Sequence, residues 1–595
     1  PTHLWLPEHR VLPFKLERTD TVYAFNIQFD WLAWNTVGKK YLFPPLPLDQ
    51  CVDIMALCGR YTYPQKLAFA GRVLRLELPK DAAGKRLIKK ICCPPFEYTK
   101  ADLQKFYTYC VRDVDSMREL VSKLPADSLS DEEQEAWLIT AEINQRGLPV
   151  DGPLVKRIVQ AVELQKKVAL RGLPALTDGA IKTLGQTAAI RAWCKTQGVD
   201  LPNLQAETVA KYIEEAEPRG LPSKVVKLLK LRQNFGRISV KKLDIILNQM
   251  HKNRVYDNLR YHGAATGRWA GMSLQPHNFP RAKVKDEEAE IQKFIDGSIM
   301  KYNPIESAKG LVRACITAPK GKLLAIADFA SIENIILAWV AGEISVLEIH
   351  HNGEDEYTHF ACDLWNLEYE QVSPSQRTMA KPAVLGAGYT LGAKGLLGYA
   401  ASMGVKMSME EAEKAIFTYR NGRPKIVKFW YSVSDYAVLA IQNPGKAFTY
   451  NGCRFQVRGD RAGTRWLTLK LPSGRMLYYN SPQVKEYTYG FLPTAMGING
   501  YTKQWERMKI IPGRMTENIV QALARDVLLP AKRRLRKRNY DIIFSVHDEV
   551  VAEVDESFGQ KDLEMMCKIM CAFPVWAPDL PLRAEGAIRR RYAKI

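Results

Sequence analysis

The chain has 595 residues, and at roughly 100–200 residues per domain we expect about three to five units rather than a single core. No run approaches the ~18 apolar residues that span a bilayer, and the first residues lack a signal-peptide pattern, so we expect a cytoplasmic protein with no membrane partner. Lys and Arg number 85 against 64 Asp and Glu, a formal charge of +21 that suits either a nucleic-acid partner or a solvated basic surface.

The N-terminal part of the chain alternates short apolar runs with helical patterns. Residues 22–26 predict a strand and residues 101–124 predict a helix. Residues 125–128 indicate a linker, and Ser130 followed by Glu133 predicts a helix start with a capping box. From about residue 131 to residue 255 the pattern is mostly helical and increasingly basic.

The C-terminal part mixes strands and helices. Residues 322–327 form a continuous apolar run that predicts a buried strand, and residues 341–440 are rich in helical patterns. Residues 446–480 contain aromatic residues and Gly-Pro turns that indicate hairpins. Residues 541–554 predict a strand, a tight turn and a second strand.

Two segments concentrate positive charge. Residues 221–254 carry nine Lys or Arg and one acid, Asp244, on an apolar helical pattern. A helix with one apolar and one basic face fits a surface that follows a nucleic-acid backbone. The second segment, Lys532–Arg538, is predicted to decorate the end of a helix.

The eleven cysteines show neither a CxxC…CxxC nor a CxxC…HxxxH arrangement. Cys92 and Cys93 are adjacent, and Cys567 and Cys571 are one helical turn apart, but no histidine stands at zinc-ligand spacing from either pair. We therefore expect buried, reduced thiols rather than a zinc site.

Acidic residues stand where predicted strands end. Asp328 closes the apolar run of residues 322–327, and Asp548 and Glu549 occupy the turn within residues 541–554. Either feature alone fits an ordinary turn. A buried strand that ends in an acid is costly unless the acid is paired or binds a metal. Together, in a basic protein, these carboxylates indicate a site for two Mg²⁺ ions that face a polyphosphate.

Four residues spaced by four predict one stripe along a helix, and they are Arg377, Lys381, Leu385 and Tyr389. The two cations would neutralise phosphates, and the apolar and aromatic side chains would lie beside a sugar and a base. An amphipathic helix whose cations happen to align explains the pattern equally well. Pro382, Gly386 and Gly388 weaken regular helicity, which a hinge closing over a nucleotide would tolerate.

Three motifs together resemble those of family A DNA polymerases, the DNA polymerase I family, here of bacteriophage type. Residues 328–333 (DFASIE), residues 377–389 (RTMAKPAVLGAGY) and residues 546–549 (VHDE) resemble motifs A, B and C. Supporting matches extend from residue 142 to the C-terminus, and they are residues 146–151 (RGLPVD), 266–268 (TGR), 274–280 (LQPHNFP) and 471–475 (LPSGR), and Gln521 with Asp526. The order and spacing of the motifs carry the resemblance, because each is weak alone.

The resemblance implies an α/β and α+β multidomain fold, with an RNase H-like 3′–5′ exonuclease-type domain followed by a right hand of palm, fingers and thumb. The implied parts are 1–125 for the exonuclease-like domain, 126–255 for the thumb and connecting helices, 256–340 for the palm with motif A, 341–500 for the fingers with inserted hairpins, and 501–595 for the palm with motif C.

The resemblance also implies residue roles. Asp328 and Asp548 would hold the two metal ions, and the implied catalytic residues are Asp328, Asp548, Glu549 and Lys381. Glu333 would be the steric gate that excludes a ribose 2′-OH. Arg377 and Lys381 would bind the incoming triphosphate, Leu385 would lie against the sugar, and Tyr389 would close over the nascent pair. The residues implied to contact primer or template are Arg268, Gln521 and His547, and the basic helices at 221–254 would grip the duplex.

Several positions depart from the family's usual pattern. Residues 329–331 are Phe-Ala-Ser where Tyr-Ser-Gln is usual, and Ile335 stands where an Arg is usual. Leu385 replaces Phe or Tyr, Thr390 replaces Gly, and Glu517 replaces Asn. The metal ligands and phosphate cations are present, so activity is expected. Sugar discrimination and base preference stay open, including the use of modified bases such as 2-aminoadenine by a phage genome.

The N-terminal third resembles the proofreading domain of this family in two short motifs. Residues 26–30 (NIQFD) resemble the second exonuclease motif and residues 109–113 (YCVRD) the third. Asp30 and Asp113 would serve two-metal hydrolysis, with Tyr109 orienting the water. The first motif, Asp-x-Glu, does not occur before Asp30. Either the native protein is longer and supplies this motif, which a start at Pro1 rather than at methionine favours, or the site has lost two metal ligands.

Two other function classes fit parts of the sequence. A 3′–5′ exonuclease or DNA-binding protein with an inactive polymerase half would not need paired metal carboxylates beside phosphate cations. An RNA polymerase of the related single-subunit type would not need a gate such as Glu333. We expect a monomeric DNA polymerase that takes a DNA primer–template and dNTPs and works with accessory replication proteins.

Overall fold

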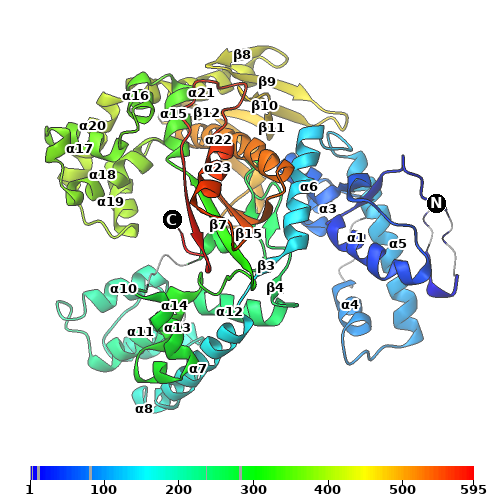
Figure 1. Ribbon diagram of the computed structural model, residues 1–595, viewed down its shortest axis with the longest axis horizontal. Helices are drawn as coiled ribbons and strands as arrows, with labels where there is room; N and C mark the ends of the chain where they lie inside the picture. The colour runs from blue at the N-terminus through cyan, green and yellow to red at the C-terminus, as the bar shows by residue number, and fades with distance from the viewer. Residues whose placement is uncertain are drawn as a thin grey trace.

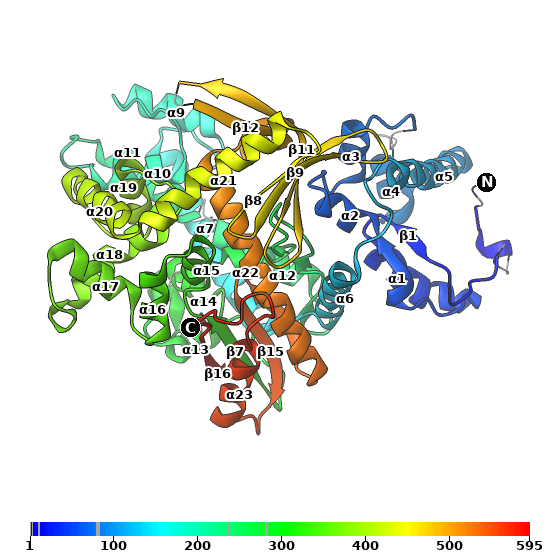
Figure 2. The same cartoon turned by 90° about the horizontal axis from the view of Figure 1, so that it is seen from above.

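The computed structural model describes residues 2, 4–9, 12, 14–78, 84–235, 238–279, 284–488 and 490–594. Figure 1 shows a central sheet containing β7 and β15, a helical arm below it, a second helical arm at the upper left, a larger sheet above it and the N-terminal region at the right. In Figure 2 these parts surround the long helix α22 (Pro512–Lys537). Arg237 and Pro280, which belong to two of the sequence motifs, lie outside the described residues.

The central sheet is antiparallel and has the strand order β14-β15-β7-β16. Its strands are β7 (Lys322–Phe329), β14 (Asp541–Val546), β15 (Glu549–Asp555) and β16 (Ala584–Arg589). The middle of β7 is fully buried because helices α22 and α23 (Gln560–Met570) pack on the sheet, which explains its continuous apolar run. Both strand predictions, for residues 322–327 and 541–554, are confirmed.

The lower helical arm, which we call the basic arm, lies below the central sheet in Figure 1. Its base packs α7, α12, α13 and α14 around one apolar core, and its tip packs α8 to α11 around another. The bounds are α7 (Gly152–Arg171), α8 (Leu173–Leu176), α9 (Thr187–Thr196), α10 (Ala206–Glu214), α11 (Ser223–Phe235), α12 (Ile238–Gln249), α13 (Glu287–Ile295) and α14 (Pro304–Leu311). The predicted basic helical segment is thus the helix pair α11 and α12.

The upper-left arm is built from consecutive helices, as predicted for residues 341–440. The bounds are α15 (Ile332–Ala341), α16 (Ile344–His351), α17 (Glu356–Trp365), α18 (Pro374–Ala387), α19 (Ala393–Ser402), α20 (Met409–Gly422) and α21 (Pro424–Gln442). Helix α18 begins at a capping box in which the Ser373 and Gln376 side chains each bind the other's backbone amide. The predicted helix therefore forms, with Pro382 inside it.

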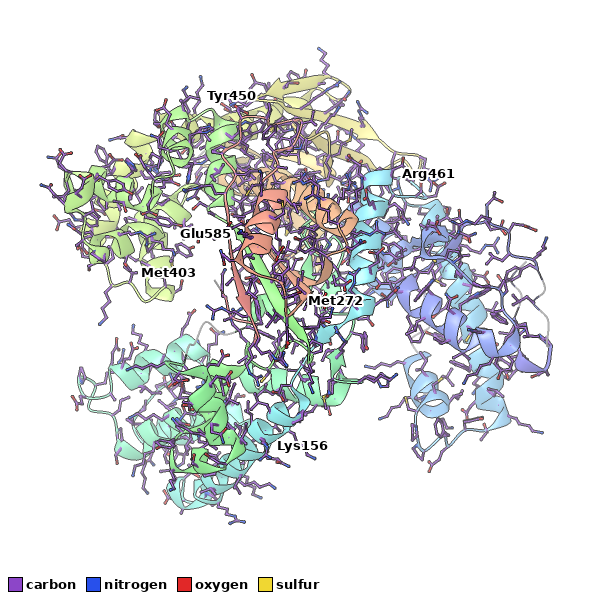
Figure 3. The ribbon with its side chains drawn as sticks, viewed as in Figure 1. Lys156, Met272, Met403, Tyr450, Arg461 and Glu585 are labelled. Carbon is purple, nitrogen blue, oxygen red and sulfur yellow. The ribbon has the colours of Figure 1, made fainter. Side chains whose placement is uncertain are left out.

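A six-stranded antiparallel sheet with the order β13-β12-β11-β10-β9-β8 packs against α21. Its strands are β8 (Ala447–Tyr450), β9 (Cys453–Gly459), β10 (Arg465–Lys470), β11 (Met476–Tyr487), β12 (Gly490–Ile498) and β13 (Trp505–Lys509). The predicted hairpins are confirmed, and the sheet continues past residue 500. Arg461, labelled in Figure 3, links the β9–β10 turn to the N-terminal region by donating to the carbonyls of Leu124 (2.8 Å) and Val121 (2.9 Å).

The N-terminal region pairs β1 (Val22–Ala24) with β2 (Cys51–Asp53) in parallel. Its helices are α1 (Ile27–Thr36), α2 (Ile54–Arg60), α3 (Leu67–Val73), α4 (Gly84–Cys92) and α5 (Lys100–Ser122). The strand at residues 22–26 and the helix at residues 101–124 are confirmed. In the described part of residues 1–125, β1 and β2 are the only strands, so an RNase H-like sheet is not established.

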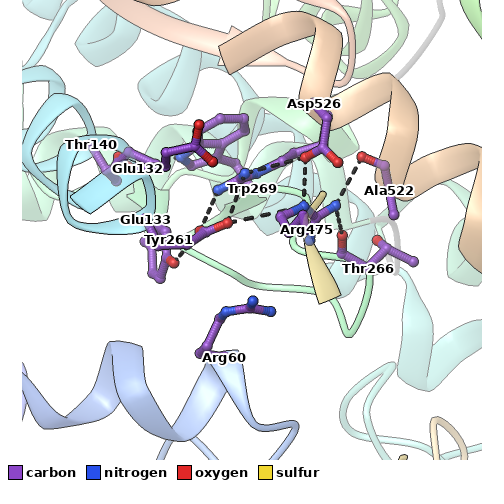
Figure 4. A network of polar contacts seen from close by, with 12 residues as sticks. Arg60, Glu132, Glu133, Thr140, Tyr261, Thr266, Trp269, Arg475, Ala522 and Asp526 are labelled. Atoms are coloured by element: carbon purple, nitrogen blue, oxygen red, sulfur yellow. Dashed lines mark hydrogen bonds and ion pairs between the residues drawn. The ribbon is translucent and has the colours of Figure 1, made fainter. Parts of the chain in front are cut away.

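Helix α6 (Asp131–Arg146) begins after Ser130 as predicted, but the expected capping box does not form. Glu133 is 2% exposed, and it accepts hydrogen bonds from Arg525 on α22 at 2.6 and 3.0 Å. Figure 4 shows this contact within a buried network that also includes Arg475 and Asp526. Arg475 Nε lies 2.5 Å from Asp526 Oδ1. A buried carboxylate gains more from a charged partner than from a backbone amide, so tertiary contacts displaced the local cap.

The basic segment Lys532–Arg538 lies at a helix end as predicted, because α22 ends at Lys537, but its first residue, Lys532, is not on the surface. Lys532 is fully buried, its ammonium lies 3.4 Å from the centre of the Trp269 ring, and it donates to Ser545 Oγ at 2.8 Å. The side chain therefore links α22 to β14 and to the segment before β6 (Ala270–Gly271).

The remaining short strands form two-stranded pairs, in which β3 (Leu148–Pro149) pairs with β4 (Arg254–Val255) and β5 (Leu259–Arg260) pairs with β6. Among the described helices, none combines the length and apolar character that crossing a bilayer requires.

Candidate active site

Three carboxylates meet at one end of the central sheet. Asp328 is the last residue but one of β7, and its register partner on the neighbouring strand is Glu549, the first residue of β15. Asp548 precedes Glu549 in the tight β14–β15 turn, where His547 has a left-handed backbone (φ 56°). The antiparallel register brings together side chains that are 220 positions apart in the sequence (548 minus 328).

The surroundings of these carboxylates disfavour two negative charges. Burial raises the pKa of Asp328, and the charges of Asp548 and Glu549 raise it further. Burial also raises the pKa of Asp548. Asp328 Oδ1 is buried and has no hydrogen-bond partner among the described residues. An unpartnered carboxylate oxygen beside a second carboxylate is the arrangement that a divalent cation neutralises.

The donor set suits Mg²⁺ that also binds a substrate. Among the described residues, no three His, Cys, Asp or Glu side chains are gathered so as to hold a metal ion by themselves. Mg²⁺ is commonly held by one or two carboxylates, with water and phosphate oxygens completing its octahedron. Asp328 and Asp548 therefore fit the two predicted metal ligands.

Glu549 is held back by the C-terminal segment. Tyr592 Oη donates to Glu549 Oε1 at 2.7 Å, and Arg313 Nη1 donates to Tyr592 Oη at 3.3 Å. Glu549 is 2% exposed, and burial raises its pKa to about 7. These contacts fix Glu549 in place beside the two aspartates.

Helix α18 presents its two cations beside helix α17. Arg377 forms a bidentate ion pair with Asp355, in which Nε and Nη2 donate at 2.8 and 2.9 Å. Lys381 lies one turn further, and both cations lie over the ring of Tyr357, at 5.2 Å for Arg377 Cζ and 5.3 Å for Lys381 Nζ. The predicted phosphate-binding pair is therefore adjacent, with Arg377 already engaged by an acid.

A second contact joins three predicted residues that lie far apart in the sequence. Tyr389 Oη donates to Glu333 Oε2 at 3.0 Å, and Arg268 Nη1 lies 2.6 Å from Glu333 Oε1. Burial and the neighbouring Glu333 raise the pKa of Tyr389 well above its usual value. Glu333 is thus fixed in position by a donor on each carboxylate oxygen.

The remaining predicted residues line the same region. Gln521 donates to Glu517 Oε1 at 3.0 Å on one face of α22. The His547 ring meets His277 edge to face, with centroids 5.5 Å apart. Leu385 is half-buried near the end of α18.

Comparisons with known proteins agree with this geometry. The family model "DNA polymerase family A" matches residues 192–442. The DNA polymerase of Bacillus phage SP02 is 29% identical over 96% of this chain and 89% of its own length. The chain is therefore similar to members of DNA polymerase family A. The thermostable DNA polymerase I of Thermus filiformis is 24% identical over 47% of this chain, and the match spans 28% of that relative.

A solved structure shares the fold of this chain. It is titled "POL domain of Pol1 from M. smegmatis complex with DNA primer-template and dNTP". The TM-score is 0.57 at 17% sequence identity, and the match covers 95% of this chain and 85% of the other.

Sequence reasoning missed three residues of the polymerase site, namely Asp355, Tyr357 and Tyr592. Asp355 caps α17 by accepting from the Thr358 amide at 2.9 Å, so the pattern Asp-x-x-Thr could have located a helix start there. The pairing of Asp355 with Arg377 and of Tyr592 with Glu549 had no local signal, because each depends on tertiary packing.

The predicted exonuclease residues lie on two helices of the N-terminal region. Asp30 is on α1, and burial raises its pKa. Tyr109 and Asp113 are one turn apart on α5. Tyr109 is buried and packs so closely on Gly84 that a Cβ there would lie 2.0 Å from its ring. This burial suits a packing role for Tyr109, and no feature of the structure tests the exonuclease assignment.

Proposed function

We propose that this chain is a family A, template-directed DNA polymerase that adds deoxynucleotides to a primer 3′ end by two-metal-ion phosphoryl transfer. One observation carries the proposal, the pair of carboxylates formed by Asp328 near the end of β7 and Asp548 in the turn before the neighbouring strand β15, with a buried Asp328 oxygen that has no hydrogen-bond partner among the described residues. The relative from a Bacillus phage, which aligns with 96% of the chain, supports the replication of a phage genome.

Each metal ion, when bound, would lower the charge cost of the reaction by stabilising the attacking and leaving oxygens of an in-line displacement. Asp328 and Asp548 would hold the ions, and Arg377 would exchange its ion-pair partner Asp355 for the triphosphate. Lys381 adds a second cation to the same phosphates. Because both cations stand on α18, movement of that helix would bring the phosphates toward the carboxylates.

The sugar and the base are selected by residues around Glu333. Its carboxylate, anchored by Arg268 and Tyr389, occupies the space that a ribose 2′-OH would need, which favours dNTPs. Leu385 lies beside the sugar, and Gln521 and His547 contact primer or template. The basic arm grips the duplex through its phosphates, which α11 and α12 suit by charge.

The N-terminal region supports a second proposal, a proofreading 3′–5′ exonuclease that uses Asp30 and Asp113. Its support is the resemblance of the segments around both residues to the exonuclease motifs and the position of these segments ahead of the polymerase part of the chain. A nuclease or DNA-binding protein with an inactive polymerase half is the competing function.

The test is extension of a labelled primer–template with Mg²⁺, with and without the four dNTPs. Asp548→Ala is expected to lower extension by about 10³-fold or more, because a lost metal ligand removes several kcal/mol of transition-state stabilisation. Asp555→Ala is the matched control, since Asp555 ends the same hairpin, is exposed and pairs only with Lys322 among the contacts described.

Loss of extension in Asp548→Ala with retained DNA binding supports the polymerase. A wild-type chain that binds DNA without extending the primer overturns the proposal. Primer shortening without dNTPs that disappears in Asp30→Ala supports the exonuclease, and shortening that survives that change overturns the assignment of Asp30.

A further inference from the structure

A cavity of about 680 Å³ lies where three distant parts of the chain meet. One wall is the end of α2 and the loop to α3, a second is residues 260–265, and the third is formed by β11 to β13 with the first turns of α22. The walls are locked together, because Arg60 donates to the Met476 carbonyl at 2.6 Å and the Tyr61 and Tyr478 rings pack 4.9 Å apart. The cavity is therefore built from secondary structure rather than from a loose loop.

The lining has the charge and surface of a single-strand binding site. Its cations are Lys66, Arg260, Lys503, Lys509 and Arg514. Its aromatic side chains are Tyr63, Phe69, Tyr478 and Tyr479. Of the described residues that line it, none is acidic. Cations that follow phosphates, interleaved with aromatic faces that stack on bases, are the features by which proteins hold unpaired nucleic acid.

Buried polar atoms in the lining lack partners. His262 is 3% exposed, and neither ring nitrogen has a hydrogen-bond partner among the described residues. Thr62 Oγ1 and Arg260 Nε, which come from two different walls, are also buried without a hydrogen-bond partner among the described residues. Burial lowers the pKa of His262 well below its usual value, so the ring is neutral and offers one donor and one acceptor. A nucleobase edge presents the complementary pattern, and an apolar ligand would leave these atoms unsatisfied.

The position of the cavity favours the template strand. Arg514 and Asn518 line the cavity. The preceding residue, Gly513, packs directly against the end of α18, and a Cβ at Gly513 would lie 2.2 Å from Tyr389 O. The cavity therefore adjoins the side of the active site at which the next pair forms. The carboxylates that would face the primer end belong to a different edge of the fold, at the β14–β15 turn.

We propose that this cavity receives an unpaired nucleotide of the template strand before that nucleotide reaches the active site. The proposal rests on the proposed polymerase function. An unpaired primer 3′ end offers the same chemistry, so the experiment must separate the two strands.

Photocrosslinking of the wild-type chain assigns the strand. One substrate carries 5-iodouracil in the 5′ template overhang, and a second carries it in an unpaired primer 3′ end. We expect the template arm to crosslink to peptides containing residues 59–69 or 477–479. Crosslinks at these peptides from the primer arm alone, or from neither arm, overturn the proposal.

A variant measures the contribution to binding. Lys66→Gln with Lys503→Gln removes two exposed lining cations, and Lys39→Gln with Lys485→Gln removes two exposed cations outside the lining from the same two parts of the chain. On a long 5′ overhang we expect the first pair to weaken DNA binding by about tenfold and the control pair to leave it unchanged. On a substrate with a single unpaired template nucleotide both pairs should behave like the wild type.

Equal weakening by both pairs, or equal weakening on both substrates, overturns the cavity as the site, because it reports general charge loss. The binding assay needs no catalysis. A wild-type chain that fails to extend the primer therefore contradicts the polymerase proposal alone, while crosslinking and binding still decide on the cavity.

Discussion

At the scale of single residues, the contact between Arg377 and Asp355 engages the guanidinium that is predicted to bind the triphosphate. The pair is bidentate, yet Arg377 is 45% exposed and Asp355 is 30% exposed, so solvent screens it. A partly exposed pair contributes about 1 kcal/mol at most. Such a contact orients the guanidinium without preventing its transfer to a triphosphate.

Asp355→Asn is expected to lower the apparent KM for dNTPs by about fivefold or less, since Arg377 is released from a competitor worth about 1 kcal/mol. Asparagine keeps the cap of α17, so the helix start is retained. Steady-state extension with varied dNTP concentration measures the change. Arg377→Gln is the opposing control and should raise KM. An unchanged KM in Asp355→Asn would show that the ion pair does not compete with the nucleotide.

The raised pKa of the buried Asp53 carboxyl group predicts that the stability of the N-terminal region depends on pH. Asp53 is 1% exposed, and burial raises its pKa from 3.8 to about 6, although the Asn26 and Met55 amides donate to it. The folded state therefore binds a proton more tightly than the unfolded state, and the stability that this confers is present below pH 3.8 and lost as pH rises through 6. Urea unfolding of Asp53→Asn and wild type over this range should show the wild type losing roughly 2–3 kcal/mol relative to the variant. A pH-independent difference would contradict the raised pKa.

At the scale of elements, the start of α22 fixes the end of α18. A Cβ on Gly513 would lie 2.2 Å from Tyr389 O and Thr390 Oγ1, and Trp430 Nε1 donates to the Gly388 carbonyl at 2.6 Å. Helix α18 thus ends against α22 and α21. Any motion of α18 over the site must pivot at this junction.

Gly513→Ala is expected to destabilise the chain by about 1–3 kcal/mol and to reduce kcat, because the backbone of residues 389–390 must move away. Gly398→Ala is the matched control. Gly398 lies in α19 with nothing within 4 Å of a Cβ, so alanine should stabilise that helix by roughly 0.5–1 kcal/mol. Thermal unfolding and extension assays measure both. Equal behaviour of the two variants would show that the junction is loosely packed.

At the scale of the whole molecule, the network in Figure 4 joins parts that are far apart in the sequence. Glu133 comes from α6, Arg525 and Asp526 from α22, and Arg475 from the turn before β11. Burial alone would raise the pKa of Glu133, but the guanidiniums of Arg525, Arg60 and Arg475 hold it below its usual range. The charges compensate one another only while all these elements are docked.

Glu133→Gln is expected to lower stability by about 3–5 kcal/mol, because it leaves buried guanidiniums without their counter-charge. Glu132→Gln is the control, since the neighbouring exposed side chain should change stability by about 0.5 kcal/mol or less. Differential scanning calorimetry and urea unfolding measure the difference. Similar effects of the two changes would mean that the network adds nothing to docking.

The sequence by itself determined the strands that carry the site and the type of residue at their ends. An apolar run closed by Asp328, and two apolar runs around Asp548, required a buried sheet with acids at one edge, because side-chain burial and strand periodicity are local properties. The cation spacing along α18 was equally local. Together with the family resemblance, these patterns were enough to predict the candidate metal ligands and phosphate-binding cations.

Only the tertiary structure decided which charges meet. Glu133 could have capped its own helix but is paired with Arg525 instead. Lys532 belongs to a basic segment at a helix end, yet its side chain is buried beside Trp269. The pairing of Arg377 with Asp355 and the walls of the cavity around His262 likewise depend on how distant elements dock. A sequence pattern fixes which face of an element is buried, but the partner buried against it is set by the packing of the whole chain.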